Sequence, residues 1–144
     1  MRAFYHPDQA LHSPQQFMRT GRIASATDVP ARTAELLAAL DRLGVTPEAP
    51  ADLGRAAAAT IHPAHYLDYL ESAYARWLEL PDHGPEVWPN CFPYWNGDPA
   101  REARPPCPTD LLIAQTGYYM GDLAVPMGPH TWTLALRSTD RKST

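Results

Sequence analysis

Apolar residues at helical spacing are the clearest pattern in the first third of the chain. Four leucines fall at offsets of zero, one, four and seven, which places them on one helical face: Leu36, Leu37, Leu40 and Leu43. Pro30 suits the first position of such a helix, and Gly44 suits the position beyond its end. The pattern predicts a helix over residues 30–43.

A second amphipathic helix begins near His62-Pro63. Its apolar stripe consists of Tyr66, Leu70, Ala73, Tyr74 and Trp77. Aromatic residues in such a stripe fit either a cofactor site or a packed core, and helical spacing favours the core. Asp68 and Glu71 point away from the stripe. They fit either a catalytic carboxylate pair or a solvated helix face, and the solvated face is favoured.

Two further helices are predicted after Pro108. Thr109 or Asp110 can cap the first, whose spaced positions are Leu112, Thr116, Tyr119 and Leu123. Residues 126–129, Pro-Met-Gly-Pro, then break it. Residues 132–136 open a fourth helix, which we expect to stop at an atypical polar tail over residues 137–144.

The remaining segments are predicted to be a strand and loops. Residues 2–6 fit a first strand ended by Pro7, and residues 8–29 form a long loop of the kind that is often functional. A short strand is predicted over residues 58–61. Residues 81–108 hold eight of the chain's 16 prolines, interspersed with aromatic residues. This segment fits equally a binding rim or oligomer contact and a rigid spacer packed on the domain.

Composition narrows the classes of function. The 144 residues suit one domain, and the net charge of -4 with a pI near 5.8 argues against a nucleic-acid or anionic membrane surface. No window approaches the roughly 18 apolar residues of a membrane span, and the N-terminus has no apolar targeting segment. We therefore expect a cytoplasmic protein without nucleic-acid or membrane partners.

Few residues suggest chemistry. The chain has no glycine-rich phosphate loop, nucleophile elbow or zincin motif. His62 and His65 have the spacing of half a metal site, but His62 precedes a proline and is expected outside the helix, so hydrogen-bonded structural roles are favoured. His6 fits either a cleft or a structural role, and the structural role is favoured. Cys91 and Cys107 fit a disulfide or two free thiols, and a reducing compartment favours the thiols.

Three stretches together resemble the N-terminal part of the histone deacetylase family. They are residues 62–71 (HPAHYLDYLE), residues 90–95 (NCFPYW), and the pair 115–119 (QTGYY) with 128–132 (GPHTW). Within that family the likeness is to the bacterial acetylpolyamine amidohydrolases and deacetylase-like amidohydrolases. The resemblance implies an α/β fold of the arginase/deacetylase type, with three layers around a mainly parallel sheet. Residues 1–144 would be a helix-rich single partial domain at its front.

The resemblance also implies a zinc-dependent amide hydrolysis that this chain cannot complete. The family uses paired histidines of a G-H-H motif as base and electrostatic partner, a D-x-H pair and a later aspartate as zinc ligands, and a tyrosine at the carbonyl. None of these motifs occurs in the sequence, and all would follow Thr144. We therefore expect no catalytic residue, metal ligand or cofactor within the chain, and no activity from the chain alone.

By the same resemblance, the loops 8–29 and 81–108 lie at the mouth of the substrate channel. The candidate rim or dimer-contact residues are Phe17, Asn90, Phe92, Tyr94 and Trp95. Gln16 or Phe17 stands where polyamine deacetylases carry an acidic residue, and Asn90 where many histone deacetylases carry aspartate, so the substrate is not implied. The alternative is a non-catalytic module that uses residues 81–108 to bind a second copy or a full-length homologue.

Overall fold

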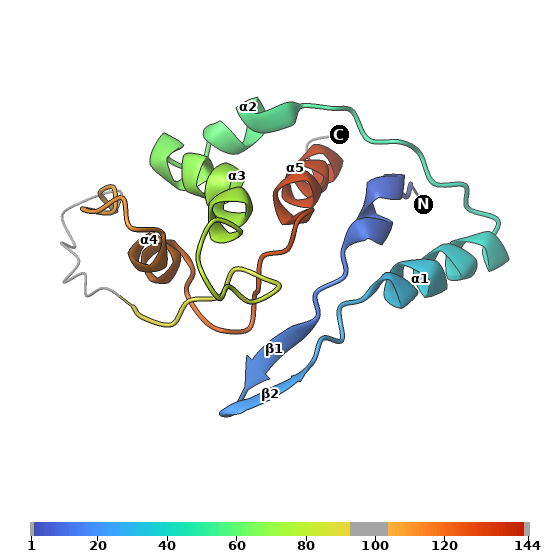
Figure 1. The fold of residues 1–144 in the computed structure, drawn as a ribbon. Helices are drawn as coiled ribbons and strands as arrows, with labels where there is room; N and C mark the ends of the chain where they lie inside the picture. The colour runs from blue at the N-terminus through green and yellow to red at the C-terminus, as the bar shows by residue number, and fades with distance from the viewer. Residues whose placement is uncertain (1, 93–103, 143–144) are drawn as a thin grey trace.

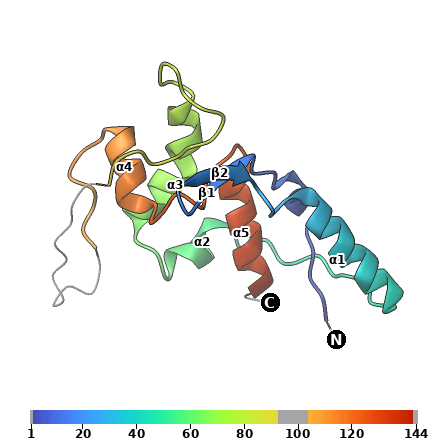
Figure 2. The same ribbon diagram turned by 90° about the horizontal axis from the view of Figure 1, so that it is seen from below.

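The computed structural model describes residues 2–92 and 104–142. Its elements in chain order are a short 3-10 helix η1 (Pro7–Leu11), strands β1 (Gln16–Arg19) and β2 (Arg22–Ser25), and helices α1 (Pro30–Arg42), α2 (Gly54–Ala59), α3 (Ala64–Trp77), α4 (Leu112–Tyr119) and α5 (Thr131–Lys142). The contacts run in a row: α4 packs on α3, α3 on α2, α2 on α5, α5 on η1, and η1 on α1. Figures 1 and 2 show α5 between the α2–α3 pair and α1, and the β1–β2 hairpin extending from this row.

The core lies between α3, α4 and the segments around Val87, Met120 and Met127. Its buried members are Tyr69, Ala73, Trp77, Val87, Leu112, Met120 and Met127. Leu70, Tyr74 and Tyr119 pack against this cluster and are partly buried. The aromatic stripe of α3 is therefore core, as its spacing predicts, although Tyr69 is more deeply buried than Tyr66.

Tyr69 places a phenol in this core without a hydrogen bond. The residue is 3% exposed, and its hydroxyl, like that of neighbouring Thr116, has no hydrogen-bond partner among the described residues. Burial raises the pKa of Tyr69 to about 12, and the nearby Thr116 opposes this effect. In the unfolded chain the Tyr69 hydroxyl loses its proton near pH 10, whereas in the folded chain it does so near pH 12. The contribution of Tyr69 to stability is therefore complete below pH 10 and is lost as pH rises through about 12.

Replacing Tyr69 with phenylalanine is expected to leave the free energy of unfolding unchanged or to raise it by about 1 kcal/mol at neutral pH, because it removes an unsatisfied buried hydroxyl. The variant should also lose less stability than the original chain between pH 10 and 12. Denaturant unfolding followed by circular dichroism at a series of pH values measures both effects. Equal losses of stability in the two proteins over that interval would contradict the assigned pKa.

The first predicted strand forms only one bridge. Phe4 pairs in parallel with Glu48: Tyr5 N donates to Glu48 O at 3.0 Å, and Glu48 N donates to Ala3 O at 2.8 Å. Within the described residues, this bridge is the only parallel pairing, and the one named sheet is the antiparallel β1–β2 pair. The mainly parallel sheet implied by the resemblance is thus represented here by a single bridge. No helix in this part of the chain is long and apolar enough to cross a membrane.

A hairpin occupies part of the predicted loop 8–29. Strands β1 and β2 pair from Gln16–Ser25 to Arg19–Arg22. The two-residue connection has φ values of 49° at Thr20 and 76° at Gly21. Tight hairpin turns of type I′ need positive φ at both positions, and glycine adopts it without strain. The Thr-Gly pair was therefore the signal for this hairpin.

The short strand predicted over residues 58–61 is wrong. The alanine run forms α2, in which Ala58 is buried. Alanine has the highest helix propensity, and the Asp52 carboxylate accepts a hydrogen bond from Gly54 N at 3.1 Å at the start of the helix. The first predicted helix is confirmed as α1, with Gly44 at a φ of 64° just beyond it.

The boundaries of α3 and α4 differ from the prediction by a few residues. Pro63 is the N-cap of α3 rather than its first helical residue, and His62 lies outside the helix as expected. Leu111, not Thr109 or Asp110, is the N-cap of α4, although Thr109 Oγ1 accepts a hydrogen bond from Leu111 N. α4 ends at Tyr119, before Gly121-Asp122.

Helix α5 does not stop at the polar tail. It continues through Arg137 to Lys142, a total of 12 residues. Arg137 forms an ion pair with Asp52 at 2.7 Å and lies 3.7 Å from the Asp8 carboxylate. Residue 137 thus ties α5 to η1 and to the connection before α2.

Candidate functional site

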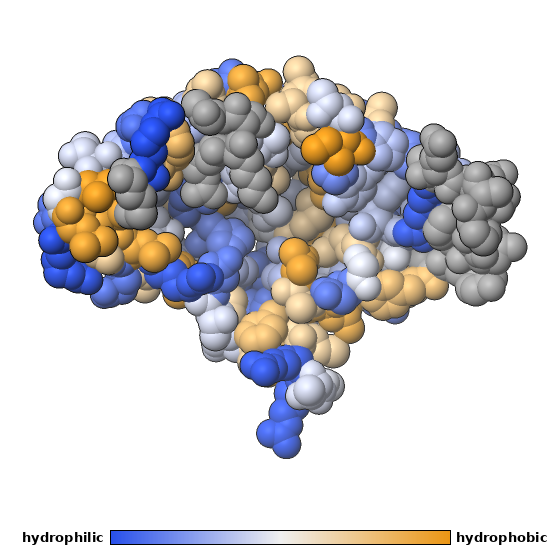
Figure 3. All heavy atoms as spheres, turned by 180° about the vertical axis from the view of Figure 1, so that it is seen from behind, coloured by the Kyte–Doolittle hydropathy of each residue, from blue (hydrophilic) through white to orange (hydrophobic). Residues whose placement is uncertain are grey.

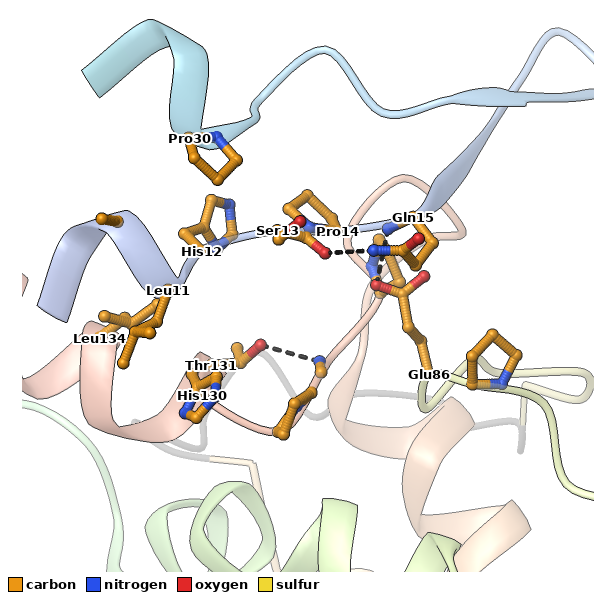
Figure 4. Close-up of a pocket in the computed structure, with 15 residues that line it drawn as sticks. Leu11, His12, Ser13, Pro14, Gln15, Pro30, Glu86, His130, Thr131 and Leu134 are labelled. Carbon is orange, nitrogen blue, oxygen red and sulfur yellow. Dashed lines mark hydrogen bonds between the residues drawn. The ribbon is translucent and has the colours of Figure 1, made fainter. Parts of the chain in front are cut away.

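A hollow of about 540 Å³ lies between the segment 11–15 and the turn that leads into α5. Pro30 and Pro85–Glu86 complete its walls, and Leu134 enters it from α5 (Figure 4). Gly128 N donates to Thr131 Oγ1 at 2.9 Å and so closes the turn at the start of α5. The walls therefore come from segments that are far apart in the sequence.

Glu86 is a buried carboxylate at this hollow. The residue is 5% exposed, and its Oε1 accepts a hydrogen bond from Gln15 N at 3.0 Å. Its Oε2 is buried and has no partner among the described residues. A buried carboxylate is stable when several donors surround it, so the single bond from Gln15 leaves Glu86 incompletely satisfied.

Two histidines also line the hollow. His12 is partly buried, and its Nε2 lies 3.2 Å from the Asp28 carboxylate, while His130 is exposed. Neither is placed with Glu86 in a metal-binding geometry: within residues 2–92 and 104–142, no three His, Cys, Asp or Glu side chains gather as ligands. The hollow therefore presents a buried carboxylate and two histidines that are not gathered as metal ligands.

The two loops predicted to lie at one channel mouth meet at residues 123–127. Leu123 O accepts hydrogen bonds from Met18 N of β1 at 3.1 Å and from Trp88 Nε1 at 2.8 Å. Val87 and Met127 pair as an antiparallel bridge, with N to O distances of 2.8 and 3.1 Å. The hairpin and the segment 85–88 are thus fixed on the same stretch of backbone.

The structure separates the candidate rim residues into two groups. Phe17, partly buried, lines a hollow of about 250 Å³ with Val125 and Pro126. Asn90 and Phe92 are exposed and line neither this hollow nor that of Glu86. Tyr94 and Trp95 lie outside the described residues. The assignment of these five residues to a rim or dimer contact stays a prediction.

The backbone beside Asn90 packs directly on α4. A Cβ atom added to Gly117 would overlap the carbonyl oxygen of Cys91 and lie 2.6 Å from its carbonyl carbon. Cys91 Sγ lies 3.6 Å from Ile113 O, one turn earlier on the same helix. Cys91 and Cys107 are both free thiols. Glycine at position 117 is what allows this close approach.

The H-x-x-H pair does not form half of a metal site. His65 Nδ1 lies 3.0 Å from the Tyr119 hydroxyl, which also accepts a hydrogen bond from Cys107 N at 3.1 Å. His62 instead packs its ring against Tyr66, with centroids 5.4 Å apart. Burial raises the pKa of the Tyr119 hydroxyl above its ordinary value. His65 therefore connects α3 to α4.

The remaining polar candidates also have structural partners. Asp68 and Glu71 both bind Arg55 of α2, at 2.5 and 2.7 Å, so the carboxylates join two helices at the surface. His6 caps η1 by accepting a hydrogen bond from Asp8 N at 3.2 Å. Sequence reasoning missed Glu86. A signal was available, because it is a charged residue between apolar neighbours in a segment predicted to pack locally.

Comparison with known proteins relates the chain to one group. Acetylpolyamine amidohydrolases from Burkholderia pseudomallei, Pseudomonas aeruginosa and Mycoplana ramosa are 35%, 32% and 31% identical to it, over 94%, 92% and 96% of its length. The crystal structure of the acetylpolyamine aminohydrolase from Burkholderia pseudomallei matches 96% of the chain with a TM-score of 0.80 and 35% identity. No family model matches the chain.

The matches cover only part of each relative. The chain spans 37% to 38% of the length of these three relatives, and 38% of the solved chain. The shared fold confirms the α/β class, and the identities over nearly the whole chain confirm the family resemblance. This chain therefore belongs to the acetylpolyamine amidohydrolase group of deacetylases and corresponds to the N-terminal part of such a protein.

Proposed function

We propose that this chain is the N-terminal scaffold of a zinc-dependent deacetylase that hydrolyses acetylated amines, and that it does not catalyse the reaction alone. The observation that carries the proposal is the length of the match: nearly all of the chain aligns with slightly more than a third of acetylpolyamine amidohydrolases. The sequence also lacks the G-H-H and D-x-H motifs that the resemblance assigns to base and metal.

Zinc does not fit the described residues. The family reaction needs a metal that polarises the acetyl carbonyl and activates water. The described part of the chain brings no three ligand-type side chains together. The rings of His62 and His65 are engaged with Tyr66 and Tyr119, respectively. We therefore assign no step of the reaction to zinc held by this chain, and place the metal in the remainder of a full-length protein.

The role left for the chain is to shape the approach to the site. Its support is the backbone junction at Leu123, which holds the β1–β2 hairpin and the segment around Trp88 together. Both belong to the loops that the resemblance places at the channel mouth. A cytoplasmic location remains part of the proposal and is supported by two free thiols, which persist in a reducing compartment.

Reconstitution from two polypeptides tests the proposal. The chain is mixed with the remainder of the Burkholderia pseudomallei relative, meaning the part that follows the matched segment. Acetate release from an acetylated polyamine is then measured with and without zinc. We expect no zinc-dependent turnover from the chain alone, and turnover from the mixture that exceeds that of the remainder alone by about tenfold or more.

The controls identify which part of the proposal fails. The remainder alone and the remainder with a heat-denatured sample of the chain set the background. Zinc-dependent turnover by the purified chain would contradict its inactivity. Binding of the two polypeptides without any increase in turnover would contradict its role as a scaffold of a deacetylase.

The second candidate function is a binding or dimerisation module that uses residues 81–108. Its support is Phe92, which is 52% exposed beside α4. Exposed aromatic side chains are enriched at protein interfaces. This function requires the chain to associate with a second copy or a full-length homologue through that loop. Light scattering on the chain before and after a Phe92→Ser substitution distinguishes it from the scaffold function.

A further inference from the structure

The β1–β2 hairpin ends in two arginines that face each other. Arg19 and Arg22 are directly opposite in the strand register, flank the Thr20-Gly21 turn and are exposed. Opposite residues in an antiparallel pair have Cβ atoms about 4.5–5.5 Å apart, and like charges in such a pair repel. The hairpin extends from the row of helices in Figure 1, and its protruding end is strongly hydrophilic in Figure 3. The tip therefore carries two adjacent positive charges at the surface.

No carboxylate in the described part of the chain neutralises this pair. Neither guanidinium forms an ion pair with a described residue. The segment 9–27 contains no Asp or Glu. Asp122 precedes Leu123, whose carbonyl binds β1, but the Asp122 Oδ1 accepts a hydrogen bond from Ala124 N at 2.7 Å. In a chain with a net charge of -4, the tip is thus a local positive patch.

An apolar hollow lies on the same face of the hairpin. Side chains alternate between the two faces of a strand, so Phe17 and Arg19 share a face and lie about 7 Å apart along β1. The register places Ala24 and Arg22 opposite them, on that face as well. Phe17 lines the hollow of about 250 Å³ together with Val125. One face of the hairpin therefore combines apolar walls with two positive charges.

The carboxylate in the wall of this hollow is already paired. Asp28 is the only acidic residue among the described residues that line it. Its Oδ1 lies 2.7 Å from Arg32 Nη1, and its Oδ2 lies 3.2 Å from His12 Nε2. Because both oxygens have basic neighbours, Asp28 offers little attraction to a cationic ligand. A ligand that reaches from the hollow to the tip meets a positive field.

We infer that this face of the hairpin binds a small molecule with a short apolar chain and an anionic end, such as a carboxylate or a phosphate monoester. The chain lies in the hollow at Phe17, and the oxyanion lies between Arg19 and Arg22. Guanidinium groups bind such oxyanions through charge-assisted hydrogen bonds. The bound oxyanion also relieves the repulsion between the two arginines. The inference is independent of the proposed function, because it concerns binding by this chain and assigns it no reaction.

Three ligands test the charge and the apolar chain separately. Hexanoate, hexylammonium and acetate are titrated into the full 144-residue chain, and NMR shifts of its backbone amides give each Kd. We expect hexanoate to bind about tenfold more tightly than hexylammonium, since the two differ in the charge that meets the arginines. Acetate should bind about tenfold more weakly than hexanoate, because it leaves the hollow unfilled. Equal affinities for hexanoate and hexylammonium overturn the inference, and so does the absence of saturable binding by hexanoate.

Two glutamine substitutions remove the same charge from different places. Arg22 is at the hairpin tip, whereas Arg42 is exposed at the far end of α1, about 18 Å along the helix from Pro30. Arg22→Gln should reduce the preference for hexanoate over hexylammonium by about threefold or more, and Arg42→Gln should change it by less than about 1.5-fold. Equal effects of the two substitutions would show that net charge, rather than the hairpin, sets the preference, and would overturn the inference.

Two serine substitutions on the hairpin test the apolar part of the site. Ile23 pairs with Met18 and so lies on the opposite face from Phe17. Phe17→Ser should weaken hexanoate binding by about tenfold and Ile23→Ser by less than about twofold. Circular dichroism melts report whether each variant is folded, and Phe17→Leu, which keeps an apolar wall, should bind within about threefold of the original chain. Hexanoate binding that Phe17→Ser leaves unchanged overturns the inference.

Discussion

Replacing Trp77 with alanine is expected to lower the free energy of unfolding by about 3–5 kcal/mol. The indole is 8% exposed at the end of α3 and belongs to the core cluster with Ala73, Val87 and Met127. Its Nε1 donates to Gly84 O at 2.9 Å, which fixes the turn after the helix. The substitution removes both the packing and this hydrogen bond and leaves a cavity within the cluster.

Leu78→Ala is the matched control for this substitution. Leu78 is the next residue along the chain and is 48% exposed, so its loss should lower the free energy of unfolding by less than about 1 kcal/mol. Urea unfolding followed by circular dichroism measures both values. Similar small changes in the two variants would show that the α3–α4 cluster is not the core of the isolated chain.

A methyl group at position 117 is expected to lower the free energy of unfolding by about 1–3 kcal/mol. In Gly117→Ala the new Cβ overlaps the Cys91 carbonyl group and lies 3.1 Å from Phe92 Cα. Backbone atoms cannot rotate away as a side chain can, so the segment 90–92 must lift from α4. The loss arises although alanine favours a helix over glycine by about 1 kcal/mol.

Gly121→Ala provides the comparison for this prediction. A Cβ at Gly121 meets nothing within 4 Å, so the free energy of unfolding should change by less than about 0.5 kcal/mol. Limited proteolysis of the segment 90–92 adds a local measurement, because only Gly117→Ala should make it less protected from cleavage. A Gly117→Ala variant as stable and as protected as the original chain would refute the close packing of this loop.

Helical periodicity predicted the parts of the fold that are stabilised by local pattern. The stripe around Ala73 and Trp77 identified α3 and its buried face, and Pro30 with Gly44 marked the ends of α1 within one residue. The same stripe in α1 predicted a helix but not its environment. Leu36 is 63% exposed, which the spacing of the leucines along the chain does not reveal.

The errors arose where tertiary contacts or turn geometry decide the structure. The hairpin depends on positive φ at Thr20 and Gly21, a two-residue signal inside a segment without apolar periodicity. α5 was expected to stop near Ser138, but it continues to Lys142, and Arg137 pairs with Asp52 from a distant segment. The spacing of apolar residues along the chain reveals neither the turn geometry at Thr20 and Gly21 nor the ion pair between Arg137 and Asp52.

The candidate site was less predictable than the fold. Resemblance pointed to Phe17, Asn90 and Phe92, yet Phe17 lines a hollow with Val125 and Pro126, whereas Asn90 and Phe92 are exposed away from it. Glu86 was missed because its burial depends on Gln15, which meets it only after the N-terminal segment has docked. Residues that act through distant backbone contacts carry no local signature.

The hydrogen bond between Gln9 and Leu134 joins residues 125 positions apart, and the junction at Leu123 similarly connects the N-terminal hairpin with the last quarter of the chain. Closing loops of this length has a large entropic penalty before any contact compensates for it, and proteins rich in such contacts fold slowly. Helices α3 and α4 can pair with far less loop closure. During synthesis, Gln9 and Met18 can therefore make these contacts only after residues 123–134 have emerged, whereas the Phe4–Glu48 bridge can form much earlier.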